Sequence, residues 1–227
     1  MTSLPPSGFL GHLASSDRRA LLGEGVEERF PPRATLCFQG EPGTSVMLIL
    51  SGTAKAGRTL ADGTPTLMGL CGAGDIVGEI SAIAGEDSPR LATVTAVDEV
   101  TCRVLAASGF RRVLDARPRI YRALAAVAHD RLRRAADKEA LQAAHSVTCR
   151  TARMLRELAV RNGREQPQGV LITLALSQLD LALLIGASRE AVVRALAGLR
   201  SGGIITTRRR QIVVRDLGGL THRCACR

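Results

Sequence analysis

Aromatic residues are almost missing from this chain of 227 residues. It contains no Trp, one Tyr and four Phe, and aromatic residues make up 2% of the sequence. Proteins that read single-stranded RNA or DNA stack the bases on aromatic side chains. The composition therefore disfavours that class of nucleic-acid-binding protein.

Long apolar stretches are missing as well. The nearest candidate for a membrane span, residues 170–187, carries Gln178 and Asp180 at its centre, and such groups are costly inside a bilayer. The opening residues, MTSLPPSGFL, place no basic segment before an apolar run, so they do not resemble an export signal. We therefore expect a cytoplasmic protein with no membrane partner.

The cysteines suggest no disulfide framework. Six cysteines lie far apart along the chain, and no export signal precedes them. Cys224 and Cys226, with His222 close by, form the single cluster, but a structural metal site needs a second pair of ligands at similar spacing. We expect no metal and interpret this cluster as part of a frayed C-terminal tail.

The sequence also lacks the residue sets that catalysis requires. It has no Ser-His-Asp arrangement, no paired carboxylates in an evident cleft and no lysine in a phosphate-binding loop, and its four His residues are scattered. We expect that the protein is not an enzyme and has no catalytic residues.

Basic charge is concentrated in the C-terminal third. Residues 1–145 contain 17 basic and 16 acidic residues, whereas residues 146–227 contain 14 basic residues, all Arg, and 5 acidic ones. A near-neutral front and a cationic back predict two domains with different partners. The cationic part would bind a polyanion such as nucleic acid by neutralising phosphates and releasing counterions. A basic surface that only keeps the protein soluble is the alternative.

Short apolar runs separated by turns fill residues 33–101. They are rich in Val, Ile, Leu and Thr, and the turns recur at intervals of about 8–12 residues, which is typical of an antiparallel sandwich or barrel. The turn residues lie at 40–43, 51–52, 62–63 and 72–74. Residues 46–50 and 53–55, on either side of Ser51-Gly52, predict a β-hairpin.

One long helix of about 25 residues is predicted over 119–144, which has no Gly or Pro and is rich in Ala, Leu and Arg. An apolar stripe recurs along it at steps of three and four residues. The stripe consists of Ile120, Leu124, Val127, Ala128, Leu132 and Ala135. Two interpretations stay open: a coiled-coil contact with a second copy of the chain, or packing on the helix's own domain. A second amphipathic helix is expected over 148–160, ending at Asn162-Gly163.

Residues 177–200 predict two helices joined by a tight turn. Ser177 and Ser188 are in position to cap the two helices, and Gly186 supplies the bend between them. On a helical wheel, one side of the second helix is apolar and consists of Val192, Ala195, Leu196 and Leu199. The other side carries Arg189, Glu190, Val193, Arg194 and Ala197. Arg can bond O6 and N7 of guanine together, and Glu can accept from the cytosine amino group, so this side suits the DNA major groove.

A basic hairpin is predicted after the second helix. Gly202-Gly203 turns the chain, and residues 204–207 and 212–215 are expected to form two strands. Their tip carries Arg208, Arg209, Arg210 and Gln211. Such a hairpin beside a recognition helix would contact phosphates as a wing. An ordinary pair of helices is the alternative for this pattern, but the outward residues, the wing and the charge of the segment all agree with DNA binding.

At these residues the chain resembles the Crp/Fnr family of bacterial regulators, over a span from about Arg33 to Leu217. Residues 185–194, IGASREAVVR, are similar to that family's recognition-helix signature. The resemblance implies an α+β fold in three parts. These are an antiparallel β-roll of the cyclic-nucleotide-binding type (residues 1–117), a long dimerisation helix (118–145) and a winged helix–turn–helix (146–227).

The same resemblance implies which residues bind DNA. Arg189, Glu190 and Arg194 would read the bases, while Ser177 and Gln178 would lie near the DNA backbone. Together with the second cap and the wing, the expected DNA-binding set is Ser177, Gln178, Ser188, Arg189, Glu190, Arg194, Arg208, Arg209 and Arg210.

Residues 74–94 form the second informative segment. Backbone N–H groups at Gly78-Glu79 and the Arg90 guanidinium would make a phosphate cradle, with a nearby carboxylate accepting from a ribose hydroxyl. The alternative is a surface ion pair between Glu79 and Arg90. The segment resembles the cyclic-nucleotide cassette of the Crp/Fnr family, which implies a ligand site there. That site consists of Gly78, Glu79, Ile80, Arg90, Leu91 and Ala92.

The chain departs from the family's cyclic-AMP binders at two places. Those binders often have Ser directly after the arginine, where this chain has Leu91, and they read adenine with a Thr-Ser pair that aligns with Ala135-Ala136. A cyclic nucleotide is therefore the expected effector, but without adenine readout by that pair; another nucleotide, weak binding or an empty pocket stay open. The iron–sulfur cofactor of another branch is not expected, since the first 70 residues contain one cysteine, Cys37.

These features together predict a homodimeric, sequence-specific transcription regulator whose DNA affinity is controlled by the sensor domain. Two recognition helices would enter successive major grooves of double-stranded DNA, so the site should be a palindrome with half-sites about one helical turn apart. RNA polymerase is a further partner that the resemblance implies. Two alternatives remain: a cyclic-nucleotide sensor that acts through protein contacts, and a ligand-independent regulator with a degenerate pocket.

Overall fold

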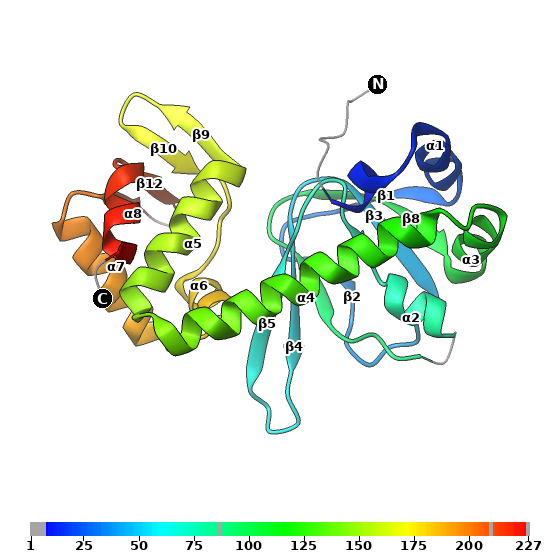
Figure 1. Cartoon of the computed structure of the whole chain (residues 1–227), viewed down its shortest axis with the longest axis horizontal. Helices are drawn as coiled ribbons and strands as arrows, with labels where there is room; N and C mark the ends of the chain where they lie inside the picture. The colour runs from blue at the N-terminus through cyan, green and yellow to red at the C-terminus, as the bar shows by residue number, and fades with distance from the viewer. Residues whose placement is uncertain (1–7, 86–87, 209–210, 226–227) are drawn as a thin grey trace. The chain divides into compact units, whose positions relative to one another are not determined.

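A computed structural model of the chain describes residues 8–85, 88–208 and 211–225 (Figure 1). The chain divides into two compact units, Met1–Arg133 and Arg134–Arg227. The division falls inside the 25-residue helix α4 (Ile120–Ala144), so each unit contains a part of that helix. The long helix predicted from the Ala-, Leu- and Arg-rich segment is thus confirmed.

The first unit is built on two four-stranded sheets whose paired strands are antiparallel, as the spacing of the turns predicts. One sheet has the strand order β1-β8-β3-β6 and the other β2-β7-β4-β5. The strands are β1 (Val26–Phe30), β2 (Thr35–Cys37), β3 (Ser45–Ser51), β4 (Ala54–Thr59), β5 (Pro65–Cys71), β6 (Ile76–Val77), β7 (Thr93–Ala96) and β8 (Val100–Ala106). An apolar cluster that includes Ile49, Val94 and Cys102 joins the two sheets.

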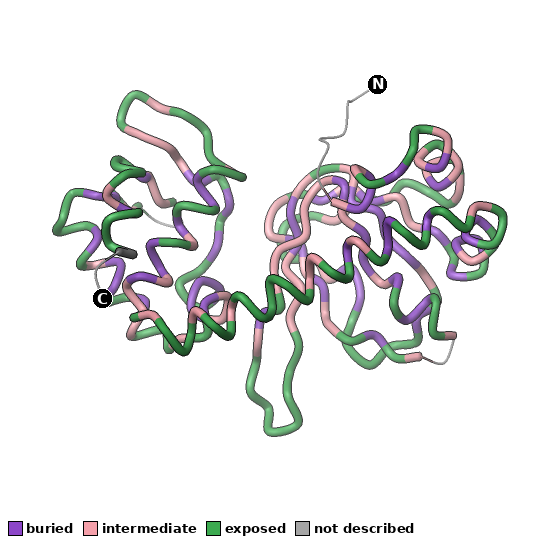
Figure 2. Tube along the Cα trace, viewed as in Figure 1, coloured by how far each residue is buried: buried purple, intermediate pink, exposed green. Residues whose placement is uncertain are grey.

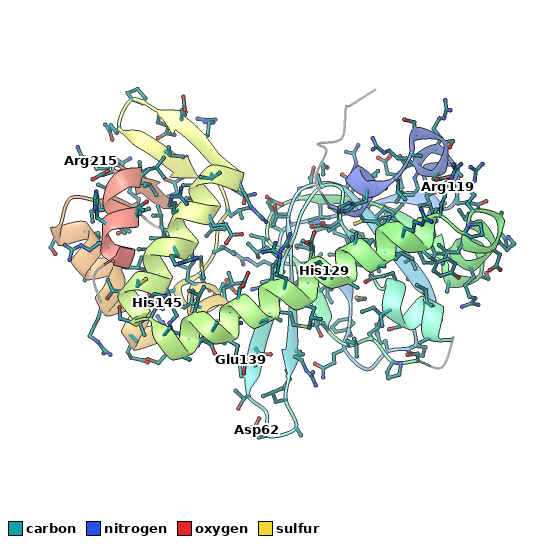
Figure 3. All side chains as sticks on the ribbon, in the orientation of Figure 1. Asp62, Arg119, His129, Glu139, His145 and Arg215 are labelled. Atoms are coloured by element: carbon teal, nitrogen blue, oxygen red, sulfur yellow. The ribbon has the colours of Figure 1, made fainter. Side chains whose placement is uncertain are left out.

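The predicted hairpin across Ser51-Gly52 is wrong. β3 pairs with β6 and β8, so both of its edges are occupied, while β4 pairs with β5 and β7 in the other sheet. The turn therefore carries the chain from one sheet to the next. Gly52 has φ +82°, and a Cβ there would lie 2.1 Å from the Glu99 carbonyl oxygen, so the crossing needs glycine. The turn at Asp62-Gly63 does join paired strands, and Asp62 lies at the tip of the β4–β5 hairpin (Figure 3).

Both faces of β3 are buried. Met47 and Ile49 face the cluster between the sheets, whereas Val46 and Leu48 face a second cluster formed with helices. Side chains alternate along a strand, so an unbroken apolar run fits a strand that is covered on both sides. The helices of this unit are the 3₁₀ helix η1 (Phe9–His12), α1 (Ser15–Gly23), α2 (Glu79–Ala84), α3 (Ala107–Ala116) and the first part of α4.

The second unit combines helices with a four-stranded antiparallel sheet of order β11-β12-β10-β9. Its elements are α5 (Val147–Asn162), β9 (Gly163–Gln166), β10 (Gly169–Ile172), α6 (Gln178–Ile185), α7 (Arg189–Ser201), β11 (Ile205–Arg208), β12 (Gln211–Val214) and α8 (Leu217–Ala225). Fully buried side chains line α5, α7 and α8, among them Leu155, Leu199 and Leu220. Figure 2 shows the buried parts of the chain in purple. The end of α5 at Asn162 agrees with the sequence, which does not predict β9 or α8.

Among the described residues, no helix is long and apolar enough to cross a membrane. Within the same part of the chain, His, Cys, Asp and Glu residues form no group of three that could hold a metal ion. The side chains of Cys224 and Cys226 lie outside what the structure describes.

Candidate functional site

Helix α6 is capped at both ends by the residues that the sequence singles out. At its start, Ser177 Oγ accepts from the Asp180 backbone N–H at 3.1 Å, and the Asp180 carboxylate accepts from the Ser177 backbone N–H at 2.9 Å. This reciprocal capping box satisfies two backbone donors that the helix leaves open. At its end, Gly186 adopts φ +62°, the left-handed conformation that stops the helix. The predicted cap and bend are thus confirmed.

Helix α7 has one buried and one exposed face, as the helical wheel predicts. Val192, Ala195, Leu196 and Leu199 are at most 5% exposed. The opposite face presents Arg189, Glu190, Val193 and Arg194 as exposed side chains, and Ser188 caps the helix by accepting from the Ala191 N–H. Within the described residues, Arg189 and Arg194 have no hydrogen-bond or ion-pair partner, so their donors face solvent.

Hydrogen bonds at the start of α7 favour the ionised form of Glu190. The backbone N–H of Glu190 and the hydroxyl of Ser188 hydrogen-bond to its carboxylate and hold the pKa of Glu190 below its usual value, and the nearby cations Arg189 and Arg194 act in the same direction. At neutral pH this exposed turn therefore offers a carboxylate acceptor beside two guanidinium donors.

The predicted wing forms directly after α7. Strands β11 and β12 pair in antiparallel register from Ile205 opposite Val214 to Arg208 opposite Gln211. Arg200 at the end of α7 donates to Thr207 Oγ1 at 3.2 Å, which ties the helix to the first wing strand. Of the four predicted tip residues, Arg208 and Gln211 are exposed and lie opposite each other at the ends of the two strands, while Arg209 and Arg210 lie outside the described residues.

In the first unit, the structure brings Gly78, Glu79 and Arg90 together. Arg90 is 5% exposed, and its guanidinium donates to the Gly78 carbonyl at 3.1 Å and to the carbonyl and hydroxyl oxygens of Ser45 at 2.6 and 3.0 Å. Gly78 has φ +85°, and a Cβ there would lie 1.8 Å from Arg90 Nη1. Only glycine fits against this arginine, which explains the residue type in physical terms.

The alternative of a surface ion pair between Glu79 and Arg90 is wrong. Glu79 is buried and pairs with Arg131 of α4, which also donates to the Ile76 carbonyl at 2.6 Å. Sequence reasoning missed Arg131 and Ser45. A signal for Arg131 exists, since it continues the spacing of Ile120, Leu124 and Val127 along the buried side of α4; no spacing links Ser45 to Arg90.

The remaining predicted ligand residues lie at the surface of this unit. Ile80 and Leu91 are 51% and 52% exposed, and Ala92 is half-buried. They add apolar surface next to the buried Glu79 and Arg90, so polar recognition in this segment depends on those two side chains and on the backbone.

The apolar stripe of α4 is divided between two environments. Ile120, Leu124 and Val127 are buried in the cluster of the first unit, which confirms packing on its own domain for that half. Further along, Ala128, Leu132 and Ala135 are exposed, and Leu132 reaches 71% exposure. In a single copy of the chain, this second half of the stripe is exposed to solvent.

Two family models match the chain. The cyclic nucleotide-binding domain matches residues 27–117, and the Crp-like helix-turn-helix domain matches residues 149–223. The CRP-like cAMP-activated global transcriptional regulator of Mycobacterium tuberculosis H37Rv is 33% identical over 194 residues, or 86% of each chain. The cAMP-activated global transcriptional regulator CRP of Escherichia coli O157:H7 is 27% identical over 187 residues, or 82% of this chain and 88% of that one.

Solved structures show the same fold. The c-di-GMP responsive global regulator CLP of Xanthomonas campestris has a TM-score of 0.78 at 23% identity, covering 89% of this chain and all of that one. A CRP-family transcriptional regulator from Thermus thermophilus has a TM-score of 0.73 at 25% identity, covering 88% and 97%. The two family models and the sequence relatives define a non-enzymatic transcription regulator with a cyclic-nucleotide-type sensor domain and a DNA-binding helix–turn–helix. The chain belongs to the Crp/Fnr family.

Proposed function

We propose that this regulator works as a homodimer that reads a palindromic DNA site with the exposed face of α7. The observation that carries the proposal is the pair of solvent-facing guanidinium groups, Arg189 and Arg194, beside the ionised Glu190 on a helix whose other face is buried. Arg pairs with guanine and Glu with cytosine in the major groove. The proposed contacts to the DNA backbone come from Ser177, Gln178, Ser188, Arg208, Arg209 and Arg210.

The readout is tested with Arg189→Ala and Arg194→Ala on a palindromic probe selected from random sequence. Each variant should lose about 1–3 kcal/mol of discrimination, roughly 5- to 150-fold, because one bidentate base contact is removed. Fluorescence anisotropy against the selected and a scrambled probe measures this. The control is Arg156→Ala, an exposed arginine on α5, which should change both affinities equally if it changes either. Full sequence preference in both α7 variants would show that the readout is wrongly assigned.

Salt dependence separates this proposal from a sensor that acts only through protein contacts. Specific binding should weaken steeply with salt because phosphate contacts release counterions. It should still exceed binding to random sequence by at least about a thousandfold. Equal affinity for both probes at every salt concentration favours the protein-contact sensor. RNA polymerase is the proposed protein partner, since the relatives are transcription regulators.

For the effector we propose a cyclic nucleotide bound at Gly78, Glu79 and Arg90. The family match of the sensor domain supports this, and the relatives named above are cAMP-activated or c-di-GMP responsive. Its base would not be read by hydroxyl groups at Ala135 and Ala136, which carry none. A ligand phosphate would compete with Ser45 for the donors of Arg90.

One observation favours a second candidate, a ligand-independent regulator. Arg90 is buried and its donors already have acceptors within the chain. Calorimetry with cyclic AMP, cyclic GMP and c-di-GMP decides between the two, with Arg90→Ala as the control. Heat from one nucleotide that disappears in the variant supports the effector. No heat from any nucleotide supports the second candidate.

A further inference from the structure

The C-terminal end of α6 leaves carbonyl oxygens without helical partners. The last four carbonyls of any α-helix lack intrahelical donors, and α6 is only eight residues long. Its closing turn is partly satisfied, since the Gly186 and Ala187 N–H groups donate back to Leu183 and Ala182. The Leu183 carbonyl has only the long backbone contact of 3.4 Å from the Gly186 N–H, and the carbonyls of Ile185 and Gly186 accept from no backbone donor among the described residues.

Side chains from two other helices donate to these carbonyls. Arg150 Nη1 of α5 donates to Ile185 at 2.7 Å and to Gly186 at 3.1 Å. Lys138 Nζ of α4 donates to Leu183 at 3.2 Å. Gln142, one helical turn after Lys138, makes a longer contact to Ile185 at 3.5 Å. All of these residues belong to the second unit, whose first residues are the end of α4.

The end of α4 lies close to the turn between α6 and α7. A Cβ on Gly186 would lie 1.9 Å from Gln142 Nε2, so any side chain there would displace the Gln142 amide. Lys138 is half-buried there, and burial lowers the pKa of its ammonium group. Holding a cation in that place is compensated by the negative end of the α6 dipole and by its open carbonyls.

We propose that Lys138, Gln142 and Arg150 form a carbonyl clamp that fixes the turn between α6 and α7 to the end of α4. These are positioning residues: because α7 begins shortly after Gly186, the clamp holds the angle at which Arg189 and Arg194 meet DNA. This inference rests on the proposed DNA reading by α7. A direct contact of Lys138 or Arg150 with phosphate is the competing role for the same cations.

The clamp is tested with Lys138→Met, Arg150→Gln and the double variant. The control is Arg153→Gln, one turn further along α5, exposed and without a partner among the described residues. Without DNA, hydrogen exchange of the Gly186 and Ala187 amides should be at least tenfold faster in the double variant and unchanged in the control. With DNA, affinity for the selected palindrome should fall at least tenfold, while affinity for random sequence and the salt slope stay the same.

Two results would overturn the proposal. Unchanged exchange at Gly186 and Ala187 would show that the side chains do not hold the turn. An equal loss on both probes, with a salt slope reduced by about one, would assign the cations to phosphate instead. If the wild-type protein prefers no sequence, the proposed DNA readout fails, and the exchange measurement still decides on the clamp.

A conservative variant separates positioning from packing. Lys138→Arg keeps a donor for the Leu183 carbonyl and should restore both slow exchange and sequence preference relative to Lys138→Met. If Lys138→Arg behaves like Lys138→Met, the donor is not what holds the turn, and the assignment of Lys138 is wrong.

Discussion

Single glycines decide how closely the backbone approaches charged groups in this protein. Gly78 and Gly63 share φ +85°, but a Cβ on Gly78 would lie 1.8 Å from Arg90 Nη1, whereas a Cβ on Gly63 would meet nothing within 4 Å. The two positions therefore separate the cost of the left-handed conformation from the cost of the contact with Arg90.

We expect Gly63→Ala to lower the free energy of unfolding by about 1–2 kcal/mol, the usual cost of a left-handed non-glycine residue. Gly78→Ala should cost about 2 kcal/mol more, because Arg90 must leave its acceptors while it remains buried. Urea denaturation measures both values. Equal costs for the two variants would mean that Arg90 moves aside freely, and that the contact does not explain Gly78.

Burial also controls the reactivity of single thiols. Desolvation in the core between the sheets, with a smaller contribution from Glu28, raises the pKa of Cys102 to about 12. The thiolate is the reactive form, so at pH 8 iodoacetamide should alkylate Cys102 at least about tenfold more slowly than the half-buried Cys71. Peptide mass spectrometry gives the two rates. In urea the two cysteines should react alike, and similar rates in the folded protein would contradict the closed core.

The N-terminal caps of α6 and α7 differ in the number of backbone donors that they satisfy. Ser177 takes part in a reciprocal capping box with the buried Asp180, whereas the exposed Ser188 satisfies one backbone donor, the Ala191 N–H. A box satisfies two backbone donors and keeps the carboxylate of Asp180 hydrogen-bonded.

Ser177→Ala should therefore lower the free energy of unfolding by about 1–2 kcal/mol, and Ser188→Ala by about 0.5–1 kcal/mol. Denaturant titration of both variants checks the order of the two effects. A larger loss for Ser188→Ala would indicate that the start of α7 contributes more to the stability of the second unit than the capping box does.

The exposed half of the α4 stripe is the surface on which the proposed homodimer depends. Leu132 is 71% exposed, and Ala128 and Ala135 flank it at steps of four and three residues. The exposed residues Tyr121 and Ala125, which are not part of that stripe, continue this spacing toward the start of α4. That spacing is typical of a two-stranded coiled coil. A second copy of the chain would cover it and would place two α7 helices on one palindrome.

Leu132→Glu should give a monomer, because each copy of the chain would place a carboxylate in the contact between the two α4 helices, where the like charges repel. The matched control is Val160→Glu on α5, an apolar residue with 69% exposure outside the stripe. Analytical ultracentrifugation measures the mass of each variant, and circular dichroism checks that both keep their fold. A dimeric Leu132→Glu protein would show that the copies meet elsewhere.

The helix–turn–helix could be predicted because its signals are local. Ser177, Gly186 and Ser188 act on backbone groups within four residues, and the two faces of α7 follow from the helical period alone. The β3–β4 hairpin was predicted wrongly for a related reason: a two-residue turn at Ser51-Gly52 suits a hairpin and a crossing between sheets equally well. Which of the two forms depends on the partners at the edges of β3.

The amino-acid sequence by itself was enough to predict the strand-rich N-terminal unit and the long helix. It also predicted the cationic helix–turn–helix with its wing, and the face of α7 that is exposed to solvent. Periodicity, capping and charge act over a few residues and can be read along the chain. The partners of the donors Arg90, Arg131 and Lys138 emerged only in the folded chain. Their acceptors include backbone carbonyls, which every residue carries, so only the packing of distant segments selects among them.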